Sequence, residues 1–216
     1  MKVFVLGISG AIGTLLADEL STRGIEVRGL VRTPAQQADL AARGVETTLG
    51  ELSAMSAPEL AEAMTGSDAT VYTAGSNGGA REVTEAIDGD GVVKALEAAR
   101  LERVNRFVLV SVLPESWRER DNPEEVEYYF AVKKQADIAV TRSDLDWVIL
   151  RPSLLVDDTA LGTISLGPAE AHGEIARADV AETLTELLLE PRIRRQILEL
   201  NTGTTPIREA VRANVY

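Results

Sequence analysis

The chain has 216 residues, 45% of them hydrophobic, which suits one α/β domain with a sizeable core. Its net charge of −12 and its 4% of aromatic residues argue against a nucleic-acid-binding protein, because such proteins neutralise phosphates with surplus basic residues and stack bases on aromatic rings. No cysteine is present, which excludes disulfides, thiol catalysis and cysteine-ligated zinc. The one histidine, His172, disfavours histidine-centred metal sites and serine–histidine triads, so we expect no metal.

The sequence also predicts where the protein works. No apolar run approaches the roughly 20 residues of a membrane span, so we expect no membrane association. The sequence opens directly in a strand pattern, which predicts no signal peptide and a cytoplasmic location. The oligomeric state stays open between a monomer and a homodimer.

The first strand, turn and helix organise the chain. Lys2–Leu6 (KVFVL) is a short apolar run, rich in β-branched residues, that is typical of a buried strand. The turn Gly7–Gly13 (GISGAIG) follows at once, and Thr14–Arg23 has a helical pattern. Strand, glycine turn and helix in this order are the context that a dinucleotide-binding fingerprint requires, although the spacing is GxxGxxG rather than GxGxxG. The alternative is a turn with a purely structural role.

Each glycine of the turn has its own expected role. Gly7 permits the tight turn, Gly10 leaves room for a pyrophosphate to approach bare backbone, and Gly13 lets the helix pack close to the sheet. The free N–H groups of Ala11, Ile12 and Gly13 would then face the anion, aided by the helix dipole.

The end of the second strand, Glu26–Val31, predicts the cofactor. In a dinucleotide fold, an acidic residue at this strand end binds the ribose 2′-hydroxyl, whereas an arginine accommodates a 2′-phosphate. Arg32 occupies this position, with the Thr33 hydroxyl beside it. We therefore expect NADP(H) to be preferred over NAD(H). The alternative is a solvated loop arginine.

Strand and helix patterns alternate along the rest of the chain, which predicts a single domain with a doubly wound, mostly parallel sheet of about seven strands. The further strands are expected at Val45–Leu49, Ala69–Thr73, Arg106–Val110, Asp146–Leu150 and Ile197–Leu200. The further helices are expected at Pro34–Arg43, Ser53–Met64, Val83–Arg100, Glu124–Ser143, Ala178–Leu189 and Ile207–Ala213. Val156–Gly173 has no regular pattern, so we expect irregular structure there.

Two loops follow strand ends, where ligands bind in open α/β sheets. The glycine-rich loop Ala74–Gly79 would let a ligand meet bare backbone. The polar segment Pro114–Pro123 is either a lid over the ligand edge or a plain surface loop.

One helix carries the candidate catalytic pair. Tyr129 and Lys133 are four residues apart, which places their side chains on the same face. The nearby ammonium is expected to lower the pKa of the tyrosine, which could then transfer a proton while a hydride moves to or from a nicotinamide. Ser111 ends the preceding strand and could hydrogen-bond a substrate oxygen. The alternative is a Lys133 that positions the cofactor and a Tyr129 that only packs.

Other polar residues have weaker assignments. Asp88 and Asp90 are ligands or acid–base groups, or else charges and caps on a helix face. Arg151 contacts the ligand edge or forms an ion pair, and Asp179 is expected to cap a helix.

At this point several short motifs, in their order and spacing, resemble the short-chain dehydrogenase/reductase superfamily. The resemblance is to its atypical branch of small NAD(P)-binding proteins, which includes epimerase- or dehydratase-like and NmrA-like members. The motifs are GISGAIG at Gly7–Gly13, VRT at Val31–Thr33, LGEL at Leu49–Leu52, TAG at Thr73–Gly75, DGDG at Asp88–Gly91, RFVLVS at Arg106–Ser111, YFAVKKQAD at Tyr129–Asp137, LRPSLL at Leu150–Leu155 and ARADVA at Ala176–Ala181.

The resemblance implies a Rossmann fold with strand order 3-2-1-4-5-6-7. It implies cofactor contacts at Gly7, Ser9, Gly10, Ala11, Ile12, Gly13, Arg32, Thr33, Glu51, Leu52, Thr73, Ala74, Gly75 and Lys133. Ser111, Tyr129 and Lys133 match the serine and the tyrosine–lysine pair of active relatives. Asp88 stands where many relatives have an asparagine that helps a proton relay, and Glu51 stands where they usually have an aspartate.

Three functions follow as alternatives. The first is an NADP(H)-dependent oxidoreductase acting on a small carbonyl or quinone-like substrate. The second is a non-catalytic NADP(H)-binding sensor, as the NmrA-like regulators imply. The third is an NAD(P)-dependent epimerase or dehydratase. A small substrate-side region is expected at about residues 153–175, and because little chain follows Pro152, a nucleotide-sugar substrate is not favoured.

Overall fold

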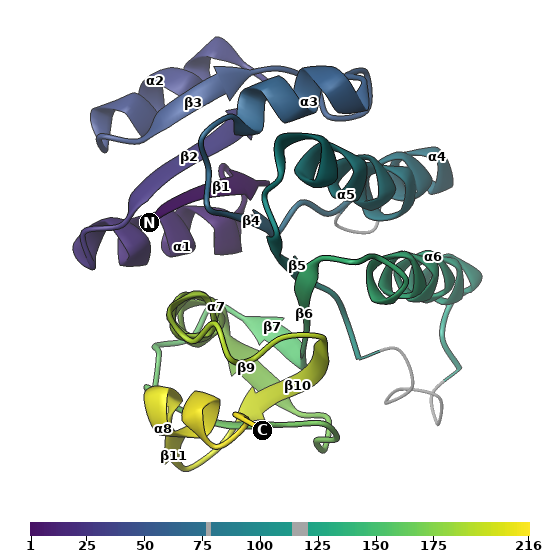
Figure 1. The fold of residues 1–216 in the computed structure, drawn as a ribbon. Coiled ribbons are helices and arrows are strands. Elements are labelled where there is room, and N and C mark those ends of the chain that lie inside the picture. The colour runs from purple at the N-terminus through teal and green to yellow at the C-terminus, as the bar shows by residue number, and fades with distance from the viewer. Residues whose placement is uncertain (77–78, 114–120) are drawn as a thin grey trace.

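A twisted sheet of nine strands forms the middle of the computed structural model, which describes residues 1–76, 79–113 and 121–216 (Figure 1). Its strands are β1 (Lys2–Leu6), β2 (Glu26–Val31), β3 (Glu46–Leu49), β4 (Ala69–Tyr72), β5 (Arg106–Val110), β6 (Asp146–Pro152), β8 (Thr163–Gly167), β10 (Gln196–Thr202) and β11 (Thr205–Pro206). A separate parallel pair consists of β7 (Leu154–Val156) and β9 (Glu174–Ala176).

The sheet order is β3-β2-β1-β4-β5-β6-β10-β8-β11. From β3 to β10 all neighbouring strands are parallel, and their order is that of the predicted seven-stranded Rossmann sheet. The doubly wound single-domain α/β fold is therefore confirmed. The count of about seven strands was too low, because β8 and β11 add an antiparallel edge beyond β10.

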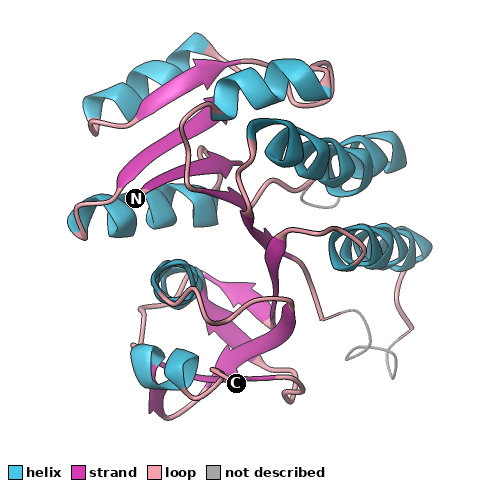
Figure 2. Cartoon of the chain, in the orientation of Figure 1, coloured by secondary structure: helices cyan, strands magenta, loops and turns pink. Residues whose placement is uncertain are grey.

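The two faces of the sheet are covered by different helices (Figure 2). One face carries α1 (Ala11–Thr22), α2 (Pro34–Ala42), α7 (Arg177–Leu189) and α8 (Ile207–Arg212), and the other carries α3 (Ala57–Met64), α5 (Asp90–Glu102) and α6 (Glu124–Thr141). Among the helices of the described ranges, none combines the length and apolar character needed to cross a bilayer.

The central strands are apolar at every position because both of their faces are buried. In β1, Val3 and Val5 belong to the core under α1 and α7, whereas Phe4 and Leu6 belong to the core under α3 and α5. Successive side chains of a strand point to opposite faces, so an uninterrupted apolar run is needed when helices cover both. This is why KVFVL predicted a buried strand correctly.

The helix expected at Val83–Arg100 is interrupted, so that prediction was wrong in detail. The chain forms a short α4 (Arg81–Thr84), then a π-helical turn at Glu85–Gly89, and then α5. Tyr72 explains part of this, because its hydroxyl donates to the carbonyl of Ile87, and a Cβ on Gly91 would lie 2.5 Å from that hydroxyl oxygen. A π-helical turn is wider than an α-helical turn and makes room for the Tyr72 hydroxyl. Such turns are frequent at functional sites.

Arg106, at the start of β5, forms hydrogen bonds at the C-terminal end of α7. Its guanidinium donates to the carbonyls of Leu187, at 2.7 Å, and of Ile193, at 2.5 Å. The last carbonyls of a helix lack partners within the helix, and a cation beside them also interacts favourably with the helix dipole. Arg106 thus joins the central sheet to the C-terminal part of the chain.

We predict that Arg106→Met lowers the free energy of unfolding by about 2–3 kcal/mol, because the methionine keeps part of the stem but leaves buried carbonyls unpaired. Urea denaturation measures the change. Arg194→Met is the control, since Arg194 is 64% exposed and its ion pair with Asp146 is long, at 3.8 Å; its change should stay within about 0.5 kcal/mol. Equal losses in the two variants would contradict the role given to Arg106.

Candidate functional site

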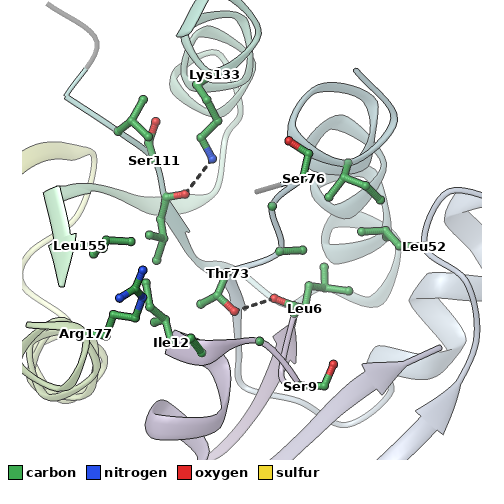
Figure 3. Close-up of a pocket in the computed structure, with 18 of the residues that line it drawn as sticks. Leu6, Ser9, Ile12, Leu52, Thr73, Ser76, Ser111, Lys133, Leu155 and Arg177 are labelled. Carbon is green, nitrogen blue, oxygen red and sulfur yellow. Dashed lines mark hydrogen bonds between the residues drawn. The ribbon is translucent and has the colours of Figure 1, made fainter. Parts of the chain in front are cut away.

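A cleft of about 860 Å³ opens at the carboxyl ends of the parallel strands (Figure 3). Most of the residues predicted for the site line it: Gly7, Ser9, Gly10, Ala11, Ile12, Arg32, Glu51, Leu52, Thr73, Ala74, Gly75, Ser111, Tyr129 and Lys133. Gly13, Thr33 and Asp88 are not among the lining residues. Each of these three instead contacts a residue that does line the cleft: Gly13 packs on Gly7, Thr33 forms a capping box with Gln36, and Asp88 binds Lys133.

Close backbone contacts require glycine at two positions of the turn. Gly7 has a φ of +87°, and a Cβ there would lie 2.5 Å from the amide nitrogen of Ala74. A Cβ on Gly13 would lie 2.1 Å from the carbonyl oxygen of Gly7. Gly13 therefore allows the helix to pack onto the turn, as predicted, while Gly10 and its neighbours face the cleft.

The N-terminus of α1 is left without a side-chain cap. Its N-cap residue is Gly10, and no acidic residue occupies its first turn. By contrast, α2 and α3 each begin with a capping box, Thr33 with Gln36 and Ser56 with Glu59. The Thr33 hydroxyl thus serves α2, whereas the first amides of α1 have no such partner and are free to bind an anion.

The far end of the cleft is lined by Arg32, Gln36, Glu51 and Leu52. Within the described part of the chain, the exposed Arg32 guanidinium has no hydrogen bond or ion pair. The corner at Leu52 is held in place because its carbonyl accepts a 2.7 Å hydrogen bond from Lys94. An unpaired guanidinium beside a fixed corner can bind an anionic group of a ligand.

Asp88 lies behind the wall of the cleft and is fully buried. One carboxylate oxygen accepts from the Ser76 amide at 2.9 Å, and the other lies 3.4 Å from the Lys133 ammonium. Lys133 also donates to the Val110 carbonyl at 3.1 Å (Figure 3). Asp88 therefore links the loop after β4 to Lys133 and fixes the position of the ammonium.

Tyr129 lines the same cleft as Lys133, but its predicted acidification is wrong. Burial, and then the negative charge of Asp88, raise the pKa of the Tyr129 phenol. The ammonium of Lys133 does not offset this, because it is paired with Asp88 and the Val110 carbonyl. Among the described residues, the phenol oxygen has no hydrogen-bond partner.

Ser111, at the end of β5, is only 3% exposed, and its hydroxyl makes no hydrogen bond among the described residues. The carboxylate of Asp137 is buried nearby and accepts from Arg151 at 2.8 and 3.0 Å. Burial raises the pKa of Asp137, and the Arg151 guanidinium partly offsets this. Of the two alternatives for Arg151, the structure shows the ion pair.

Sequence reasoning missed several cleft residues that follow β4 and β6 or begin α7. These are Ser76, Ser153, Leu155, Asp157 and Arg177. Their segments did carry signals, since Ser76 lies in the Ala74–Gly79 loop, Ser153 and Leu155 in LRPSLL, and Arg177 in ARADVA, but no site role was given to these residues individually. Asp179 does not cap α7; its carboxylate accepts from the amides of Leu161 and Gly162. The lid proposed for Pro114–Pro123 falls largely on residues 114–120, which lie outside the described residues.

The comparison with protein families indicates the class of ligand. Residues 7–191 match the sequence profile of an NAD(P)H-binding family, a span that includes the glycine turn and every predicted site residue. The chain belongs to this NAD(P)H-binding family. The resemblance to atypical short-chain dehydrogenases/reductases is thereby confirmed, and so is the expectation of a nicotinamide dinucleotide as ligand.

Relatives of full length are known from bacteria and yeast. The chain is 37% identical over 214 residues to the uncharacterized sugar epimerase YhfK of Bacillus subtilis, covering 98% of this chain and 99% of that protein. It is 32% identical over 227 residues to the UPF0659 protein YMR090W of Saccharomyces cerevisiae, covering 99% and 98%.

Solved structures share the fold closely. A provisionally named NAD-dependent epimerase/dehydratase from Bacillus halodurans superposes with a TM-score of 0.90 at 29% identity, covering 99% of both chains. ChuY, an anaerobilin reductase from Escherichia coli O157:H7, superposes with a TM-score of 0.78 at 25% identity, covering 94% of this chain and 98% of that one. Each name belongs to the solved protein that this chain resembles.

The turn geometry predicts opposite outcomes for two glycine variants. Gly13→Ala should destabilise the fold by about 3 kcal/mol, because its Cβ overlaps the Gly7 carbonyl. Gly10→Ala should fold, since Gly10 has a φ of −79° and a ψ of 170° and its Cβ would lie 3.1 Å from the nearest atom, the Gly7 carbonyl oxygen. Its NADP(H) affinity should fall by about tenfold, or about 1.4 kcal/mol, because the methyl group stands where a diphosphate approaches.

Thermal unfolding and calorimetric titration measure these two effects separately. A folded Gly10→Ala variant that binds the dinucleotide as tightly as the wild type would show that the ligand does not approach the turn at this point.

Proposed function

We propose that the protein is an NADP(H)-dependent oxidoreductase that acts on a small carbonyl or quinone-like substrate. The observation that carries the proposal is that one cleft contains the glycine turn together with Ser111, Tyr129 and Lys133. A dinucleotide bound along the turn would bring its nicotinamide toward these three side chains. ChuY, a reductase of similar fold, supports this class of reaction.

A bound NADPH would supply a hydride to the substrate, which at a carbonyl carbon forms the new C–H bond. Tyr129 donates the proton that completes the hydroxyl, and its raised pKa keeps the phenol protonated for that task. Lys133, fixed by Asp88, has an N–H left for the nicotinamide ribose. The unpaired hydroxyl of Ser111 would hold the substrate oxygen.

The segment of about residues 153–175 is proposed as the substrate side of the cleft. Ser153, Leu155 and Asp157 from its first part line the cleft beside Ser111. The segment is short and contains only three short strands or parts of them, so it suits a small substrate better than a nucleotide sugar.

An epimerase or dehydratase is the second candidate, because YhfK and the Bacillus halodurans protein carry such names. The two candidates differ in whether the reaction consumes the cofactor. An oxidoreductase consumes NADPH with its substrate, whereas an epimerase or dehydratase regenerates the cofactor in each cycle. A sensor would bind the cofactor without any turnover.

For cofactor preference we predict that wild-type protein binds NADPH more tightly than NADH and that Arg32→Ala removes the difference. The variant should lose about tenfold in NADPH affinity, about 1.4 kcal/mol, with NADH unaffected, because only NADPH carries the 2′-phosphate. Calorimetric titration with both cofactors measures this.

Arg142→Ala is the matched control, since Arg142 is also exposed but does not line the cleft. Equal affinities of the wild type for the two cofactors, with Arg32→Ala changing neither, would remove the proposed preference while leaving dinucleotide binding intact.

For catalysis we predict that Tyr129→Phe lowers turnover by at least about tenfold without changing NADPH affinity, because the phenol acts only on the proton. The measurement is NADPH oxidation, first in a screen of carbonyls and quinones and then with the best substrate. Tyr128→Phe is the control: its hydroxyl lies 3.4 Å from Glu85 and outside the cleft. NADPH binding without oxidation by any acceptor would favour the sensor.

A further inference from the structure

Helices α1 and α7 begin at the same edge of the sheet. α1 connects β1 to its parallel neighbour β2, and α7 lies on the path from β6 to its parallel neighbour β10. Both helices therefore run back against the strand direction, and they pack side by side. A 2.9 Å ion pair joins Arg23, directly after the end of α1, to Glu186 in the C-terminal half of α7. Their N-termini consequently lie together beside the cleft.

Arg177 is the first residue of α7 and lines the cleft. Figure 3 shows its guanidinium on the same side of the cleft as Ile12, the second residue of α1, which also lines the cleft. A cation at a helix N-terminus opposes the helix dipole, so this placement does not stabilise α7 by itself. A doubly charged anion between the guanidinium and the uncapped amides of α1 would offset both positive charges.

The present partner of Arg177 is Asp157, at 2.6 Å. The side chain of Asp157 is 85% exposed, whereas that of Arg177 is 25% exposed. Ion pairs with one solvated partner contribute little to stability, so an anion in the cleft can replace this carboxylate at small cost. Asp157 also lines the cleft, so the carboxylate and an incoming anion would compete for one guanidinium.

We propose that Arg177 is a ligand of the cofactor's diphosphate and that Asp157 occupies its guanidinium until the diphosphate displaces it. The diphosphate is then held from two sides, by the first amides of α1 and by the first side chain of α7. The proposal rests on dinucleotide binding in the cleft, but it needs neither a preference for NADP(H) nor catalysis, because both dinucleotides contain the same diphosphate.

The first test is Arg177→Gln in the full chain, with calorimetric titration of NADP⁺, NAD⁺ and ADP-ribose. ADP-ribose keeps the diphosphate and lacks the nicotinamide. We expect all three affinities to fall by a similar factor of about tenfold. Arg177→Lys, which keeps the charge, should recover part of the loss. Thermal unfolding verifies that each variant is folded.

The second test is Asp157→Asn, which removes the competing carboxylate from an exposed position and should not affect folding. We expect the three ligands to bind severalfold more tightly. In the double variant the gain should vanish, because Asp157 acts only through Arg177. Arg43→Gln and Asp18→Asn are the matched control, an exposed 3.0 Å ion pair outside the cleft, and should leave all affinities unchanged.

Each outcome bears on a defined claim. Unchanged ADP-ribose affinity in Arg177→Gln overturns the proposal and places the guanidinium at the nicotinamide or the substrate. Weaker binding in Asp157→Asn also overturns it, because the ion pair would then be structural. Wild-type protein that binds none of the three ligands overturns this proposal and the proposed function together, whereas equal NADP⁺ and NAD⁺ affinities affect only the cofactor preference.

Discussion

The contact between the glycine turn and its surroundings is the constraint on which the site depends. Gly7 passes Ala74 at the end of β4, and Gly13 rests on the Gly7 carbonyl, at distances that exclude any side chain. These contacts bring β1, β4 and α1 so close together that Gly7 and Gly10 line the cleft without a side chain. An anion can then meet several amides of α1 at once, which a helix capped by its own serine or threonine would not allow.

A buried charge organises the opposite side of the cleft. Asp88 has no exposure to solvent, yet its two oxygens hold the Ser76 amide and the Lys133 ammonium. The π-helical turn that carries Asp88 follows from the passage of the chain around Tyr72. Asp88, which this π-helical turn carries, thus fixes the loop after β4 and positions the Lys133 ammonium. Together with burial, its charge raises the pKa of Tyr129.

The strands of the parallel sheet and the glycine turn could be predicted because they depend on local patterns: apolar runs buried on two faces, and glycines at Gly7–Gly13. The order of the strands was implied by the family resemblance. The strand Thr163–Gly167 could not be predicted, since it carries no continuous apolar run and only two of its five residues are buried. The pKa of Tyr129 was predicted in the wrong direction because the spacing to Lys133 is visible in the sequence, while the burial of Asp88 is not. Arg177 escaped notice because its place beside α1 arises only from the packing of two helices.

The far edge of the sheet has a consequence for assembly. Its last strand, β11, comprises only Thr205 and Pro206, and it pairs antiparallel with β8. A proline has no amide hydrogen to donate, and so short a strand offers hardly any free backbone to a neighbouring molecule. At Thr163 and Ile164, where β11 covers β8, the antiparallel addition therefore protects this border against continuation of the sheet from one molecule into the next.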